Sequence, residues 1–280
     1  MRWPIDPESP HAGELPMLDD DELRMLLEAL DRPWKGYRKV RKGVKKRIRR
    51  HMQALDCSTV DRYFLHISRD AAVRSDCEAR LRVTISRFFR DRHLWQELHD
   101  RLLPDLIRRF PSPLRTWSAG CACGEEPYSL AITWHRLAPG TAFSLLATDA
   151  DKICLQRARA GVYTPGSLKE VSGEIRETYF DSVRSGRQFR LRRYGLPVVH
   201  WRLHDLLDTP PEPGPFHLIL MRNNLLTYYR GSRLKSALSR MIGVLAPGGC
   251  LVIGAHEALP GNEWPLDRDV KCPWVYRRNG

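Results

Sequence analysis

Two adjacent glutamates, Glu125 and Glu126, follow a turn of small residues in the stretch TWSAGCACGEEPYSLAITW, residues 116–134. The residues before the turn are apolar and those after it have a helical pattern, an arrangement in which the helix start commonly binds phosphate. Carboxylates at that place would repel a pyrophosphate, whereas one of them would hold an ammonium group. Gly120 and Gly124 allow the backbone to approach a ligand closely, although their spacing is not GxGxxG. In the alternative interpretation, both glutamates only cap the helix and complement its dipole.

A third carboxylate, Asp149, ends the next predicted strand, 24 residues after Glu125. A carboxylate at the end of the second strand of such a unit can accept hydrogen bonds from both hydroxyls of a ribose. A ligand that has a ribose and an ammonium group but no phosphate is S-adenosylmethionine. The residues therefore predict this cofactor, with S-adenosylhomocysteine as the product of its reaction.

The elements that must position these carboxylates form a repeating pattern after residue 110. Short apolar runs alternate with helical patterns, which is typical of a parallel sheet built from strand and helix units. The predicted strands are LRTWSA (114–119), FSLLATD (143–149), FHLILM (216–221) and CLVIGA (250–255). The predicted helices are PYSLAITWHRL (127–137), DKICLQRARAGVY (151–163, ending at Gly161) and SRLKSALSRMIGVL (232–245). We therefore predict an α/β fold with a doubly wound sheet.

Polar residues follow the predicted strands at the places where such a sheet binds its ligands. Arg222 and Asn223 follow FHLILM, and His256 and Glu257 follow CLVIGA. Because ligands of open parallel sheets bind beyond the carboxyl ends of the strands, we expect these residues to surround one site with the carboxylates.

The chain outside this sheet divides into three parts. Residues 1–17 contain prolines and acidic residues, and we expect a flexible leader there. Residues 18–110 have helical patterns without a comparable strand signal, which predicts a small all-α N-terminal domain, with the sheet domain over 111–280. Residues 163–207 form a less regular, arginine-rich insert, for which we expect a small group of antiparallel strands.

A formal net charge of +13 indicates an acidic partner. Lysines and arginines are concentrated from Lys35 to Arg50, around an apolar stripe at helical spacing. Repulsion among these charges is easily understood if an acidic protein neutralises them, although a solvated helix face is the simpler alternative. Nucleic acid is the rival partner, but the segment has neither interleaved aromatics nor a common nucleic-acid-binding motif, so we expect no nucleic acid.

The expected environment of the protein follows from its apolar segments and cysteines. No apolar run approaches the roughly 20 residues that span a bilayer, and the N-terminus has no apolar core typical of a secretory signal. We therefore expect a cytoplasmic monomer without membrane insertion. The seven cysteines are odd in number and include no CxxC pair, so we expect neither a disulfide framework nor a metal site. Cys121 and Cys123 are interpreted as structural residues.

Five motifs together resemble the chemotaxis receptor methyltransferases, the CheR family. WSAGCACGEEPYSLA (117–131) is similar to the family motif WSAGCSTGEEPYSLA, and VTISRFFRD (83–91) is similar to TNLTAFFRE. LLATDADKICLQRARAGVY (145–163), HDLLDTPPEPGPFHLILMRNNLL (204–226) and GGCLVIGAHEAL (248–259) resemble three further motifs. The resemblance extends in order from about Leu18 to Tyr276.

This resemblance implies a Rossmann-like class I methyltransferase sheet with a small β insert, preceded by the small helical domain. It also implies methyl transfer from S-adenosylmethionine to glutamate side chains of a chemoreceptor-like protein, whose acidic helical cytoplasmic domain would be the partner. In some family members the insert docks on the receptor tail.

The motifs also imply roles for individual residues. By their positions, Glu125 would hold the methionine ammonium group and Asp149 the ribose, while Asp205 and Leu206 would lie near the adenine. The other cofactor-binding candidates are Thr84, Ser86, Arg90, Gly120, Arg222 and Asn223. Arg90 is also a candidate for steering the acceptor carboxylate, with a surface salt bridge as its simpler alternative. Tyr228 is the second catalytic candidate.

The chain departs from the family pattern mainly on the acceptor side. Thr84 and Ser86 replace an asparagine and a threonine, so the polar contacts of the family would be made by shorter groups. The tyrosine of the family motif RNVLIYF aligns with Thr227, which leaves Tyr228 one position later and, in a helix, about 100° away. Two alternatives to glutamate methylation therefore stay open. One is a methyltransferase for another protein or a small carboxylic acid, and the other is a non-catalytic sensor that binds S-adenosylmethionine.

Overall fold

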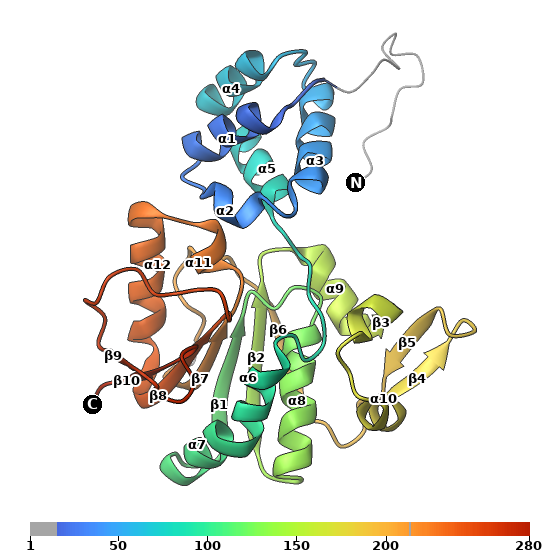
Figure 1. Cartoon of the computed structure of the whole chain (residues 1–280), viewed down its shortest axis with the longest axis vertical. Coiled ribbons are helices and arrows are strands. Elements are labelled where there is room, and N and C mark those ends of the chain that lie inside the picture. The colour runs from blue at the N-terminus through green and yellow to red at the C-terminus, as the bar shows by residue number, and fades with distance from the viewer. Residues whose placement is uncertain (1–15, 213) are drawn as a thin grey trace. The chain divides into compact units, whose positions relative to one another are not determined.

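The computed structural model describes residues 16–212 and 214–280 (Figure 1). These residues form two compact units, which divide between Val83 and Thr84. The predicted leader falls outside the described residues except at positions 16 and 17.

The first unit is entirely helical over its described residues, as the sequence predicts. Its helices are α1 (Asp20–Ala29), α2 (Trp34–Tyr37), α3 (Arg41–Ala54), α4 (Val60–Arg69) and α5 (Ala71–Leu81). Asp19 caps α1, accepting from the backbone of Glu22, whose side chain accepts in return from the backbone of Asp19. Leu23, Leu26 and Leu27 form the buried face of α1, whereas Met25 is 58% exposed.

The basic segment is not one helix. The chain forms the short α2, turns at residues 38–40, and begins α3 at Arg41. Val44, Ile48 and Met52 are fully buried on α3, as their spacing predicts. The opposite face of α3 carries charged residues that are exposed to solvent.

The second unit contains a seven-stranded sheet. Its helical elements are α6 (Arg92–Glu97), the π-helix η1 (Leu98–Leu102), α7 (Leu103–Arg109), α8 (Glu125–Leu137), α9 (Lys152–Ala160), the 3₁₀ helix η2 (Pro165–Leu168), α10 (Gly173–Tyr179), α11 (Leu225–Tyr228) and α12 (Gly231–Gly243). Its strands are β1 (Leu114–Ala119), β2 (Phe143–Asp149), β3 (Val162–Tyr163), β4 (Phe180–Val183), β5 (Gln188–Leu191), β6 (Val199–Leu203), β7 (Phe216–Met221), β8 (Leu245–Ile253), β9 (Leu266–Arg268) and β10 (Val275–Arg278).

The strand order of the main sheet is β6-β2-β1-β7-β8-β10-β9. Strands β6, β2, β1, β7 and β8 are parallel, and β10 and β9 add antiparallel strands at one edge. Alternate residues of each strand face opposite sides. Leu218 and Leu220 of β7 join the cluster that includes α8, and Ile219 and Met221 join the cluster that includes α12. Helices α8 and α12 therefore cover opposite faces, which confirms the doubly wound α/β prediction (Figure 1).

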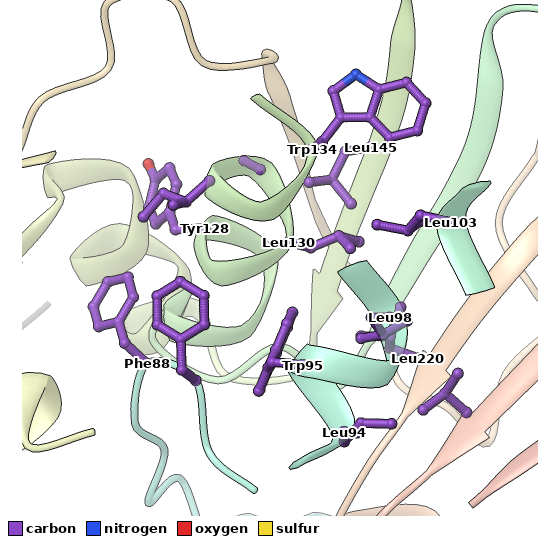
Figure 2. Packing of buried hydrophobic residues seen from close by; sticks show 14 of the residues in the cluster. Phe88, Leu94, Trp95, Leu98, Leu103, Tyr128, Leu130, Trp134, Leu145 and Leu220 are labelled. Atoms are coloured by element: carbon purple, nitrogen blue, oxygen red, sulfur yellow. The ribbon is translucent and has the colours of Figure 1, made fainter. Parts of the chain in front are cut away.

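Residues 84–110 pack with the sheet and not with the helical unit in which we expected them. Leu94, Trp95 and Leu98 are buried in the cluster formed by α8 and the sheet (Figure 2). Arg101 donates to both carboxylate oxygens of Asp269, at 2.8 and 2.9 Å. Residues 92–109 are helical, as predicted, but a helical pattern alone does not reveal which core buries the apolar side of a helix.

The arginine-rich insert is shorter than expected. Strands β3, β5 and β4 form a separate antiparallel sheet, as predicted, but β6, within the predicted insert, pairs with β2 in the main sheet. Its first four residues, VHWR, alternate between half-buried and exposed, so the periodicity of this edge strand resembled that of a hairpin.

Two other local details differ from the sequence prediction. Strand β8 begins at Leu245, before the predicted turn at residues 247–249, and a register irregularity opposite β7 accommodates that turn. The pair β9 and β10 near the C-terminus was not predicted. Within the described residues, no helix is long and apolar enough to cross a membrane.

Candidate functional site

The carboxyl ends of five parallel strands bring the predicted polar residues to one edge of the sheet. The chain progresses outward from β1 to β2 and β6 on one side, and to β7 and β8 on the other. The switch in direction therefore falls between β1 and β7, where open α/β sheets bind their ligands. The turn after β1 begins at Gly120, Asp149 ends β2, and Arg222 and Asn223 directly follow β7.

Glu125 occupies the first position of α8, after Gly124 in the left-handed conformation with φ 92°. A Cβ at Gly124 would lie 2.8 Å from the Cβ of Ala158, so close packing as well as backbone conformation requires glycine there. Glu125 is only 4% exposed. Its Oε1 accepts a hydrogen bond from Ser167 at 3.2 Å, whereas its buried Oε2 has no hydrogen-bond partner among the described residues.

The environment of Glu125 fits a cationic ligand. Burial raises the pKa of its carboxyl above the ordinary value of 4.5, against the opposing effects of its own backbone N–H and the hydroxyls of Ser167 and Ser86. A buried carboxylate oxygen without a donor is costly, and a ligand ammonium group would supply both a charge and hydrogen bonds. The positive end of the α8 dipole also favours the ionised carboxylate.

Glu126 is bonded differently, although it is the next residue. Its Oε1 accepts from the Ser118 hydroxyl at 2.7 Å, and its Oε2 pairs with Arg222 at 3.2 Å. Burial raises the pKa of the Glu126 carboxyl, and the charge of Arg222 opposes this shift. Both of its oxygens therefore have partners within the protein, so Glu126 supports the start of α8 and leaves Glu125 for a ligand.

Arg222 links three segments from inside the protein. Its side chain is 3% exposed and pairs with Asp91 at 2.7 Å as well as with Glu126. It also donates to the carbonyl oxygen of Arg90 at 2.8 Å. Its guanidinium group thus fixes the segment before α6 against the end of β7 and the start of α8. We propose that Arg222 positions the cofactor site through these bonds.

Asp149 fixes the turn after β1 while lying half-exposed at the end of β2. One carboxylate oxygen accepts from the backbone N–H of Ala122 and the other from that of Asp151, both at 2.8 Å. A carboxylate oxygen can accept more than one hydrogen bond, so these two backbone contacts do not by themselves exclude a hydroxyl donor. Gly120 has φ 76°, and a Cβ there would collide with Asn224, whose side-chain amide donates to the carbonyl of Ala119.

Arg90, Tyr228 and Glu257 interact on the side expected for the acceptor. Burial raises the pKa of Tyr228 to about 12, with Arg90 opposing this shift and Glu257 adding to it. Glu257 accepts from the backbone N–H groups of Asn223 and Gly254, both at 2.8 Å, and from the Thr227 hydroxyl. Thr227 and Tyr228 both belong to α11, so the one-position shift of the tyrosine relative to the family motif does turn its side chain to another direction.

The remaining predicted residues lie around this edge with fewer contacts. Thr84 and Ser86 are half-exposed in the segment before Phe88, and Ser86 is close enough to favour the ionised form of Glu125. Asp205 and Leu206 follow β6, where Asp205 accepts from the backbone of Leu207 at 3.0 Å. Leu206 packs against the cluster around α12.

Three residues of the site were missed by the sequence analysis. Ser167 comes from the insert, 42 residues after Glu125 along the chain. The sequence predicts no role for Asp91 and Asn224, although they adjoin the predicted site residues Arg90 and Asn223. Their contacts join distant segments, so neither spacing nor periodicity indicates them. Within residues 16–212 and 214–280, no group of three His, Cys, Asp or Glu side chains is arranged to hold a metal ion.

Comparisons with known proteins agree with this geometry. Residues 84–274 match the family model described as "CheR methyltransferase, SAM binding domain". A chemotaxis protein methyltransferase from Listeria monocytogenes is 34% identical over 201 residues, which cover 72% of this chain and 75% of that protein. One from Vibrio parahaemolyticus is also 34% identical, over 62% of this chain and 64% of that protein.

Among solved structures, the chain is similar to the N-methyltransferase NodS from Bradyrhizobium japonicum in complex with S-adenosylhomocysteine. That similarity has a TM-score of 0.32 and 20% identity, over 59% of this chain and 63% of that chain. The assignment rests on the family model and the sequence relatives. With the family model over more than half of the chain, the cofactor is S-adenosylmethionine, and this protein belongs to the CheR methyltransferase family.

Proposed function

We propose that this protein transfers the methyl group of S-adenosylmethionine to glutamate side-chain carboxylates of a chemoreceptor-like protein, forming glutamate methyl esters. The observation that carries the proposal is the buried Oε2 of Glu125, which has no hydrogen-bond partner within the described part of this CheR-family chain. The names of the Listeria and Vibrio relatives support the chemotaxis part of the proposal.

In this proposal the cofactor residues divide by the part of the ligand they hold. Glu125 binds the ammonium group and Asp149 binds the ribose hydroxyls, while Asp205 and Leu206 lie near the adenine. Gly120 keeps the first turn close to the ligand, and Thr84, Ser86 and Asn223 complete the surroundings. When bound, the cofactor supplies an electrophilic methyl group on a sulfonium.

The chemistry requires placement more than activation. A glutamate carboxylate is already ionised and nucleophilic at neutral pH, so transfer needs no general base. Two effects supply the acceleration. The acceptor oxygen is aligned with the methyl group, and water is excluded while the opposite charges of the carboxylate and the sulfonium are consumed. Arg90 would steer the acceptor carboxylate. Tyr228, whose pKa is raised to about 12 by burial, would stay protonated and donate a hydrogen bond instead of acting as a base.

An acidic helical acceptor also fits the exposed face of α3. Lys42, Lys46 and Arg50 are exposed at four-residue spacing, so they form one stripe along the helix. Other basic side chains of α3 have partners within the protein, since Arg41 and Lys45 pair with Asp20. The stripe, defined as Lys42, Lys46 and Arg50, is the part of the basic segment that we propose contacts the acidic partner.

The direct test uses methyl-labelled S-adenosylmethionine and the purified cytoplasmic domain of a chemoreceptor. We expect label on the receptor domain, released as methanol by mild base, because a glutamate methyl ester is base-labile. Replacement of the receptor glutamates by glutamine, a matched control, should abolish labelling. Label that is stable to base, or label on a small acid only, would contradict glutamate methylation of a protein. Binding without transfer to any acceptor would favour a sensor.

A further inference from the structure

Two thiols from different elements meet beside the proposed cofactor site. Cys123 lies in the turn between β1 and α8, two residues before Glu125. Cys154 lies in the first turn of α9, five residues after Asp149. The two Sγ atoms are 3.4 Å apart, and both side chains are buried. A sulfur bond here would connect the segments that carry the two proposed cofactor carboxylates.

The backbone around the pair keeps these thiols together. A disulfide has a sulfur–sulfur length of about 2.05 Å, so the two atoms need to approach by only about 1.4 Å. The hydroxyl of Tyr163 donates to the carbonyl of Cys123 at 3.0 Å. The adjoining Gly124 packs so closely against Ala158 of α9 that no side chain fits between them. The turn and α9 are therefore held in contact without the bond.

The two thiols also differ in acidity, as oxidation to a disulfide requires. The hydrogen bond with Cys154 holds the pKa of Cys123 below its ordinary value, against the opposing effect of burial. The same hydrogen bond, together with burial, raises the pKa of Cys154. Cys123 is therefore the more readily ionised thiol, and the thiolate is the nucleophile in such reactions. Cys154 remains protonated and lies close enough to form a disulfide with Cys123 once Cys123 is oxidised.

We propose that Cys123 and Cys154 form a reversible disulfide that weakens cofactor binding. With a peroxide as oxidant, the Cys123 thiolate attacks one peroxide oxygen, so an S–O bond forms and the O–O bond breaks. The leaving oxygen takes a proton and becomes water. The Cys154 sulfur then attacks the Cys123 sulfur, forming the S–S bond and releasing the second oxygen, with its protons, as water. Two thiols are oxidised and one peroxide is reduced.

The effect on binding follows from the anchors of Asp149. Its two carboxylate oxygens accept from Ala122, which adjoins Cys123, and from Asp151, which caps α9 through the backbone N–H of Cys154. Bringing the two sulfurs within bonding distance pulls on the backbone of Cys123 and Cys154, which adjoins both anchors, and a ligand site loses affinity when its groups move by more than about 0.5 Å. The regulatory half of the proposal, which is the weakening of cofactor binding, rests on the cofactor placement proposed above. The formation of the disulfide does not depend on that placement.

The test compares the reduced full chain with the same chain treated with hydrogen peroxide. Intact mass spectrometry should show the loss of two hydrogen atoms, and proteolysis should give a cross-linked peptide containing Cys123 and Cys154. Calorimetry with S-adenosylmethionine should then give an affinity at least about tenfold weaker for the oxidised chain, because one S–S bond displaces the ribose carboxylate. Treatment with dithiothreitol should restore both the mass and the affinity.

Two variants separate the pair from the other thiols. Cys154→Ser should form no intramolecular disulfide, and it should bind cofactor equally well before and after mild peroxide treatment. If Cys154→Ser fails to fold, Cys123→Ser serves as the test variant in its place. Cys250→Ala, which removes a buried thiol of β8, should respond like the unmodified chain.

The outcomes remain distinguishable from those for the proposed function. If the reduced chain binds cofactor but peroxide treatment gives no Cys123–Cys154 cross-link, the disulfide is overturned. A cross-link that leaves the affinity unchanged overturns the regulatory half. Failure of the reduced chain to bind S-adenosylmethionine counts against the cofactor site, and the mass measurement still decides whether the disulfide forms.

Discussion

Glu125 and Glu126 are neighbours in sequence with different surroundings. Both carboxylate oxygens of Glu126 are bonded, to Ser118 and Arg222, whereas one buried oxygen of Glu125 has no donor among the residues that the structure describes. The sequence predicted an ammonium-binding carboxylate at this turn, and the resemblance assigned it to Glu125. The role of Glu126 was not predictable, because its partner Arg222 lies 96 residues away along the chain.

The raised pKa of Glu125 predicts how cofactor binding depends on pH. Only the ionised carboxylate attracts an ammonium group, and burial raises the pKa of Glu125 above the ordinary 4.5. As the pH falls from neutral through this raised pKa, Glu125 becomes protonated and the affinity for S-adenosylmethionine should decline. Calorimetry over a pH series would measure this. In Glu125→Gln the decline should disappear, and an unchanged pH profile in that variant would contradict the assignment.

At the scale of elements, Arg222 connects the end of β7 with α8 and with the segment before α6. The strands were predictable because their apolar runs are short and bounded by turn residues, as in LRTWSA, which forms β1 over the predicted residues. The link through Asp91 was not predictable. Asp91 adopts φ 65°, uncommon for a residue with a side chain, and its position is fixed only by contacts distant in sequence.

Substituting Arg222 tests whether this link organises the site. Arg222→Lys keeps the charge but cannot reach Asp91, Glu126 and the Arg90 carbonyl together, since an ammonium group lacks the planar fork of donors. We expect a loss of about 2–3 kcal/mol in the free energy of unfolding, because buried carboxylates lose charged hydrogen bonds. Chemical denaturation measures this loss. The exposed Arg187→Lys should change stability by less than about 0.5 kcal/mol, and equal losses in both variants would contradict the account.

At the scale of the whole molecule, the sequence predicts a helical part and a sheet part. Residues 84–110 belong to the sheet part, and not to the helical part in which they were predicted to lie. Their apolar residues have the helical spacing of either part. The deciding contacts, such as Arg101 with Asp269, span 168 residues and leave no local signal. The motif VTISRFFRD, which continues into this segment, was the one clue in the sequence that the residues after Val83 belong with the sheet.

The net charge of +13 leads to a prediction about the acceptor. Reversing the stripe, with Lys42→Glu, Lys46→Glu and Arg50→Glu together, should lower kcat/KM for an acidic receptor domain at least tenfold at low salt. The difference should shrink as salt is added, because exposed charges are screened over about 10 Å at 0.1 M. Affinity for S-adenosylmethionine alone should not change. A triple variant with normal receptor methylation would show that the stripe has no part in acceptor binding.

The central claim is that Glu125, and not its neighbour, holds the ammonium group of S-adenosylmethionine. Calorimetric titration of Glu125→Gln and Glu126→Gln tests it most directly, with thermal unfolding to confirm that both variants are folded. Glu125→Gln should bind roughly ten- to a hundredfold more weakly, as expected for the loss of about 1.5–3 kcal/mol from a charged hydrogen bond. Glu126→Gln should bind within about threefold of the unmodified protein. Unchanged binding by Glu125→Gln would contradict the account.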